Sequence, residues 1–178
     1  MKLPFLLCAL CASPVQSLSG AERVVPSHVG LSAQLVASKS AGTDHFKTDY
    51  GSSDIHTERS RVVEGAVRNF GAQPVEIVAT IRWIGKKTYY NTRFLLRKQT
   101  ETRTIQAGQT ATFRGESGAV KSTDLKLVAI HVREVSGARI EGWVIEVREK
   151  TGNALVAIKG SDSHLEEMVL SGAALPAE

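Results

Sequence analysis

Residues 75–83 have the sequence VEIVATIRW, and this stretch decides the fold class. Every second residue is apolar, and the residues between them include a glutamate, a threonine and an arginine. A period of two is the pattern of a β-strand that buries one face and leaves the other to polar surroundings. Trp83 falls on the apolar face, so we expect its side chain to lie in or beside the core.

Similar short apolar stretches recur on both sides of this strand. Further strands are predicted at 29–36, 61–68, 89–96, 101–105, 110–114, 125–134, 139–148 and 154–159. Turns are predicted at 69–74, 107–109, 136–137 and 152–153, with a polar bend at 97–100. Strands do not alternate with helices. The sequence therefore predicts an all-β fold, an antiparallel Ig-like β-sandwich of seven to eight strands, with an open barrel as the alternative.

Two other segments complete the predicted organisation. Residues 163–166, Ser-His-Leu-Glu, have the form of a capping box, and apolar residues at helical spacing follow, which predicts one short C-terminal helix. Residues 38–58 are rich in Ser, Gly, Asp and Thr and are predicted to be a long surface loop. We therefore expect a flexible lead-in, first strand and long loop over 22–58 and the sandwich core over 59–178, with 29–36 joining it.

The N-terminus has the three-part plan of a secretion signal. A lysine at position 2 precedes an apolar run over 3–12, and small and polar residues follow, so we expect a signal peptide over 1–21 with cleavage near 17–21. The run is too short to span a bilayer, and no transmembrane segment is expected after cleavage. Cys8 and Cys11 are the only cysteines and both lie in this segment. The mature domain should be cysteine-free, without disulfides, and periplasmic or secreted.

The central strands carry a likeness to a known family. Residues 63–69 (VEGAVRN), 74–83 (PVEIVATIRW) and 105–113 (IQAGQTATF) combine a strand ending in Gly-x-Val-x-Asn, an alternating strand with an aromatic end, and an Ala-Gly turn before a phenylalanine. With these three features the chain resembles the FxLYD-type bacterial Ig-like domains over residues 63–113. The aromatic-Leu-Tyr-Asp signature of that family is absent, and IRWI at 81–84 occupies its place. A second likeness, over GWVI at 142–145 through SHL at 163–165, is to small exported Ig-like proteins near type IV pilus or type II secretion genes. Both imply a binding or scaffolding module of the cell envelope.

One segment combines basic and aromatic side chains in a pattern typical of binding to anionic ligands. Around Trp83 and Phe94 the candidate ligand-binding residues are Arg82, Lys86, Lys87, Tyr89, Tyr90, Arg93, Arg97 and Lys98. Positive charge and ring stacking together bind phosphates or sugars. The alternative is an ordinary solvated strand face or a charged strand edge. Because the chain is predicted to be exported, an anionic envelope polymer is a more reasonable ligand than nucleic acid, which we do not expect.

Neither a metal site nor a catalytic site is predicted. Acidic and histidine residues cluster in the long loop, namely Asp44, His45, Asp49, Asp54 and His56, but their spacing fits no known calcium or zinc motif. No nucleophile stands in a recognised local frame, and the glutamate pairs 64/76 and 141/146 are of a kind that any sandwich offers by chance. We therefore expect no cofactor and no enzyme activity.

The formal net charge of the whole chain, +4 at pH 7, indicates no particular partner. Taken together, these features favour a non-enzymatic Ig-like module that engages a protein partner in the bacterial cell envelope. Two alternatives remain open: a binder of an anionic glycan or lipid headgroup, and an accessory protein of a pilus or secretion system.

Overall fold

The computed structural model describes residues 29–47, 52–127 and 132–177, and within them the chain forms eight strands and one helix. The elements are β1 (Val29–Lys47), β2 (Ser52–Asn69), β3 (Val75–Lys87), β4 (Arg93–Ile105), β5 (Thr110–Glu116), β6 (Val120–Leu127), β7 (Val132–Glu149), β8 (Leu155–Gly160) and α1 (Ser163–Leu170). All pairs of named strands are antiparallel. The fold is an all-β sandwich with one short helix, as the alternating pattern predicted. The predicted signal peptide and lead-in lie outside the described residues.

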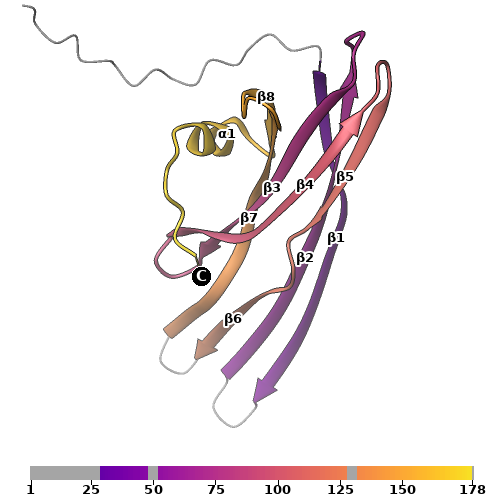
Figure 1. Ribbon diagram of the computed structural model, residues 1–178. Coiled ribbons are helices and arrows are strands. Elements are labelled where there is room, and N and C mark those ends of the chain that lie inside the picture. Colours follow the sequence, from indigo (N-terminus) through magenta and orange to yellow (C-terminus); the bar gives the residue numbers. More distant parts are fainter. Residues whose placement is uncertain (1–28, 48–51, 128–131, 178) are drawn as a thin grey trace, which may run out of the picture.

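Strand β7 joins the two layers of the sandwich (Figure 1). One layer contains β1, β2, β5 and β6, and the other contains β3, β4 and β8. Residues 132–137 of β7 pair with β6, whereas residues 138–149 pair with β3. The hydrogen-bonded order β1-β2-β6-β7-β3-β4 ends at β1 and β4, so among the described strands the sheet does not close into a barrel.

The core lies between the two layers and is apolar. Trp83 of β3 lies directly opposite Trp143 of β7, and both are buried, which confirms the core position expected for Trp83. The largest fully buried side chains of this cluster are Trp83, Phe94, Phe113, Ile77, Ile145, Val63, Val67 and Val147. Burial of these side chains is the main stabilising contribution available to the described part of the chain.

The turn between β2 and β3 is fastened by one buried polar residue. Asn69 is fully buried and donates from Nδ2 to the carbonyls of Gln73 (2.8 Å) and Ile105 (3.1 Å). Its Oδ1 accepts from the N–H of Gly71 at 2.8 Å. Its backbone exchanges bonds with the 108–109 turn, through Gly108 N–H to Asn69 O and Asn69 N–H to Gln109 O. Asn69 therefore connects two turns that are distant in sequence.

The long loop predicted over 38–58 is wrong, because β1 and β2 pair along their whole length, from Val29 opposite Asn69 to Lys47 opposite Ser52. Together with β6 and the start of β7 they form an extension, the arm, which we define as residues 38–47, 52–60, 121–127 and 132–137. Figure 1 shows it projecting beyond the layered part. Where side-chain burial is described in the arm, no residue is buried. Over 38–58 backbone pairing makes these polar residues strands, so hydrophobic periodicity gave no sign of them.

Three other boundaries differ from expectation. The predicted turn at 136–137 is wrong, because β7 continues through it with Gly137 at φ 89°. The predicted strand 125–134 is divided, with β6 ending at Leu127 and β7 starting at Val132, and residues 128–131 lie outside the description. The bend at 97–100 is also wrong, because these residues pair in regular register with residues 80–83 of β3, and the register shift of this pair lies before them, between Leu95 and Arg97. The turn at 152–153 is confirmed, with Asn153 at φ 53°.

Helix α1 covers the outer face of the second layer. Leu165 packs there on Ile84 and Val144. A Cβ added at Gly142 of β7 would lie 2.5 Å from Leu165 Cδ1, so the close approach of the helix requires a glycine at this position. The N-cap is Asp162, whose side chain accepts from Leu165 N–H at 3.0 Å, and the Glu166 side chain accepts from Gly160 N–H at 2.6 Å. The predicted helix is confirmed, but the capping box predicted at 163–166 is wrong. The C-terminal tail follows the edge of β4, where Leu95 N–H donates to Pro176 O at 2.9 Å.

Among the residues described, no helix has the length and apolar character needed to cross a membrane.

Candidate binding site

The basic and aromatic residues predicted from the sequence do not form one surface. They divide among two ion clusters on the outer face of the second layer, an open groove beside β7, and an exposed stretch of β4. Arg82, Lys86 and Arg93 belong to the ion clusters. Lys87, Tyr89 and Tyr90 line the groove. Arg97 and Lys98 are exposed on β4.

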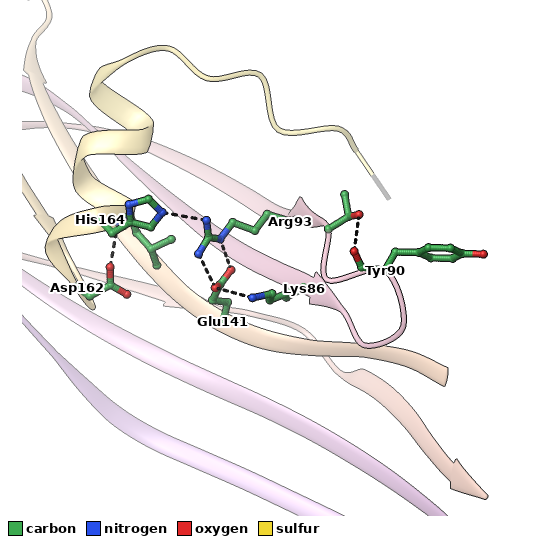
Figure 2. Close-up of polar contacts among 8 residues, drawn as sticks. Lys86, Tyr90, Arg93, Glu141, Asp162 and His164 are labelled. Atoms are coloured by element: carbon green, nitrogen blue, oxygen red, sulfur yellow. Dashed lines mark hydrogen bonds and ion pairs between the residues drawn. The ribbon is translucent and has the colours of Figure 1, made fainter. Parts of the chain in front are cut away.

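The first ion cluster joins three elements around Glu141 of β7 (Figure 2). Arg93, at the start of β4, donates two bonds to this carboxylate, at 2.7 and 2.9 Å. Lys86 of β3 lies 3.8 Å from the same carboxylate. Arg93 also contacts Nε2 of His164 on α1 at 2.9 Å. The cluster therefore connects α1, through the contact between His164 and Arg93, with strands β3, β4 and β7.

Electrostatics explain why this cluster is stable. Hydrogen bonding from Arg93, aided by the charge of Arg93 and Lys86, holds the pKa of Glu141 below its usual range despite partial burial. The same hydrogen bond raises the pKa of Arg93. Because a guanidinium can only donate, Nε2 of His164 is the acceptor in this contact. The positive charge of Arg93 is thus already matched within the protein.

The second ion cluster surrounds Glu146 of β7, one of the few buried charged residues in the described part of the chain. Burial raises the pKa of this carboxyl, but hydrogen bonds from Arg82 and Arg148 outweigh it and leave the pKa below its ordinary value. Lys98 lies directly opposite Arg82 on β4. Paired and partly buried in this way, Arg82 is poorly placed to bind an external anion.

A groove with a volume of about 750 Å³ lies between the β3–β4 turn and the start of β7. Its lining is Lys87, Tyr89, Tyr90 and residues 133–138. The tyrosines are exposed by 75% and 73%, and their rings meet edge to face with centroids 4.9 Å apart. Figure 2 shows the Tyr90 ring directed away from the ion cluster at Arg93. Large exposed aromatic side chains next to a hollow are typical of a binding surface.

One wall of the groove is an open strand edge. Strand β3 pairs with β7 only from Ala138 onward, and the last contact on that side is Thr88 N–H to Gly137 O at 3.1 Å. The chain then turns away through Tyr89 and Tyr90. Residues 133–136 pair with β6 on their other side, and no described strand pairs with them on the groove side. In an antiparallel ladder every second residue points its N–H and C=O away from its partner, so backbone groups of this segment face the groove.

The acidic and histidine residues of the predicted loop lie on the arm hairpin. The backbones of Thr43 and His56 are directly opposite, as are those of His45 and Asp54, while Asp49 falls outside the described residues. His56 Nδ1 lies 3.0 Å from Thr123 Oγ1 on β6. Within the ranges described, no group of three or more His, Cys, Asp or Glu is placed to hold a metal ion.

Sequence reasoning missed the β7 side of both the ion cluster and the groove. Glu141 was treated as one of several chance carboxylates, and 136–137 as a hairpin turn. The sequence of residues 132–135, Val-Arg-Glu-Val, gives no local signal for an open edge, because it does not show which side of the strand is paired. Only the pairing of distant strands places Tyr89 and Tyr90 beside β7.

Comparison with known proteins adds little to this geometry. No protein-family model and no curated protein sequence matches the chain. Among solved structures, β-glucuronidase 2 of Bacteroides uniformis bound to a cyclophellitol-type aziridine aligns with a TM-score of 0.39 and 12% identity, over 74% of this chain and 12% of that one. A structural genomics target, SoR45, aligns with a TM-score of 0.31 and 10% identity, over 76% of this chain and 87% of that one. This chain thus spans about an eighth of the glucuronidase, and similarities this low support no functional argument.

Proposed function

We propose that this chain is an exported, non-enzymatic β-sandwich module of the bacterial cell envelope that binds a protein partner. The signal-like N-terminus supports export. The groove between the β3–β4 turn and β7 supports binding, and it is the single observation that carries the proposal. It combines two exposed tyrosines with an open strand edge, and both features are used repeatedly in protein recognition.

The carboxylates of the second layer support a structural role better than a catalytic one. Glu141 and Glu146 each accept hydrogen bonds from arginine side chains, and the pKa of each is lowered. A general acid needs a raised pKa, and a nucleophile or base needs access to substrate. Both carboxylates are instead engaged by the basic side chains around them.

Binding to an anionic glycan or lipid headgroup is the weaker alternative. Three of the six basic residues expected to attract an anion are engaged in ion pairs with Glu141 or Glu146. Lys87 lies at the groove, whereas Arg97 and Lys98 lie on β4, so the remaining charges are not gathered on one element. A protein partner makes fuller use of the tyrosines and of the backbone edge.

Site-specific photo-crosslinking in the native cell tests the proposal. A photoreactive phenylalanine analogue is placed at Tyr89, and a matched control carries it at Phe70, which is 64% exposed at the opposite end of β3. We expect a discrete protein adduct from position 89 that is absent from position 70. Identical adduct patterns at both positions, or none at position 89, would contradict binding of a protein at this groove.

Export is tested separately by N-terminal sequencing of the accumulated protein. We expect it to begin between residues 18 and 22, in agreement with cleavage near 17–21. Recovery of the chain from the cytoplasm with its N-terminal segment intact would contradict export. That result would leave the crosslinking experiment valid for a partner in another compartment.

A further inference from the structure

We propose that the partner binds as an extended peptide that adds a strand to the open edge of β7 at residues 133–136, beneath Tyr89 and Tyr90. This inference rests on the proposed function and specifies the form in which the partner binds. The occupant is a segment of another protein that contains no proline, carries one apolar side chain for the tyrosines and has an acidic side chain near Lys87.

The topology of β7 defines where such a strand would lie. On one side β7 is paired first with β6 and then with β8. On its other side, residues 138–149 of β7 pair with β3. On that same side, no described strand pairs with residues 133–136. An added segment would therefore continue the line of β3, with its end next to Thr88. Main-chain bonds to such an edge provide affinity that depends little on sequence.

The groove has the dimensions and lining that this mode of binding needs. This open groove has a volume of about 750 Å³, which is room for the side chains of a short peptide segment laid along it. Val135 and Ala138 give one wall an apolar component, and the two exposed tyrosine rings provide the other. An apolar side chain of the peptide can pack between them, so the tyrosines would supply specificity.

Charge complementarity indicates an acidic residue in the partner. Lys86, Arg93 and Arg133 are each matched by a carboxylate, Glu141 for the first two and Asp124 for the third. Lys87 lines the groove, and no ion pair is found for it within the described part of the chain. Glu134 also lines the groove and would repel a carboxylate beside it, so the acidic residue of the peptide is placed at Lys87, which makes no ion pair of its own among the described residues.

The test uses linear peptides, because the natural partner is not identified. A displayed library of random twelve-residue peptides is selected on the purified chain, in the form in which it accumulates in the cell. The best peptide is then resynthesised with a single backbone N-methyl group at each position in turn, and dissociation constants are measured by calorimetry. Methylation removes one amide donor and leaves the side chain unchanged.

Strand addition predicts a loss of affinity with a period of two. Methylation of residues whose N–H faces β7 should weaken binding about 10-fold, the equivalent of a lost hydrogen bond, whereas methylation of the residues between should change it less than about 2-fold. Tyr89→Ala with Tyr90→Ala should weaken binding about 10-fold or more. The matched control, Phe70→Ala, also removes an exposed ring and should leave binding unchanged.

Contrary results separate this inference from the proposed function. A methylation profile without the period of two, or equal binding by the double tyrosine variant and the wild type, would overturn strand addition while an adduct at Tyr89 still supported a protein partner. Sedimentation velocity tests whether a second copy of this chain, rather than another protein, occupies the edge. A concentration-dependent dimer that the double tyrosine variant abolishes would assign the edge to self-association and overturn a peptide of another protein.

Discussion

At the scale of single residues, Asn69 shows how one polar side chain stabilises an apolar sandwich. The buried Asn69 side chain bonds two carbonyls and one N–H, and the bond to Ile105 O is fully buried while the other two are partly buried. We expect Asn69→Ala to lower the free energy of unfolding by about 3 kcal/mol, because three side-chain hydrogen bonds that connect two turns are lost together. Urea denaturation measures this. Gln73→Ala removes an exposed side chain of the same turn, and a loss as large as that for Asn69→Ala would show that the turn, not the hydrogen bonds, is responsible.

The ion pair between Arg93 and Glu141 should make a measurable contribution to the free energy of unfolding. Both side chains are partly shielded from solvent, with 32% and 18% exposed, and the two hydrogen bonds between them fix their geometry. A double-mutant cycle with Arg93→Ala and Glu141→Ala should give a coupling energy of about 1–2 kcal/mol. The same cycle on the more exposed pair Lys150 and Glu76 should give less than about 0.5 kcal/mol. Similar coupling in both cycles would contradict the role assigned to burial.

At the scale of elements, β7 depends on a glycine where it passes from one layer to the other. Gly137 has φ 89°, and a Cβ there would lie 2.4 Å from the carbonyl oxygen of Lys121. We expect Gly137→Ala to destabilise the protein by about 2 kcal/mol or more, through both backbone strain and the clash with β6. Gly152→Ala is the control, because nothing lies within 4 Å of a Cβ at that position. Equal thermal stability of the two variants would show that β7 does not need this conformation.

The strands differ in how well they could be predicted from the sequence. Strands with one face in the core, such as β3, were predicted because burial imposes a period of two on their sequence. Residues 136–137 were predicted to be a hairpin turn because a Ser-Gly pair suits tight turns, whereas the positive φ of Gly137 here allows a continuous strand to change partners. In the arm no side chain whose burial is described is buried, so residues 38–58 gave no periodic signal. The groove depends on the pairing of β3 with β7, which is a non-local property.

At the scale of the whole molecule, the ion clusters make stability depend on pH. The pKa values of Glu141 and Glu146 are both lower in the folded protein, so their contribution is complete above the ordinary carboxyl value of about 4.3 and is lost as the pH falls through the folded values. We expect the free energy of unfolding to decrease from about pH 5 toward pH 3. Glu146→Gln should be less stable than the wild type at pH 7, with the two curves converging in acid. Lys159→Gln is the control, because it changes the charge of a residue outside the ion clusters. If its stability also fell below that of the wild type at pH 7 and converged with it in acid, the assignment to Glu146 would be contradicted.

The division into a layered part and an arm makes a further prediction about the whole molecule, namely that the two parts open independently. Strand β2 belongs to both: residues 62–68 lie in the layered part beside β5, and residues 52–59 lie in the arm beside β6. The first segment includes the buried Val63 and Val67, whereas the described side chains of the second are not buried. Amide exchange protection should therefore be at least about 100-fold lower in the arm half, because its opening exposes little apolar surface. Hydrogen exchange followed by mass spectrometry compares the two halves of this one strand. Equal protection would mean that the arm opens only when the whole sandwich unfolds, and that the edge of β7 at the groove is held as rigidly as the core.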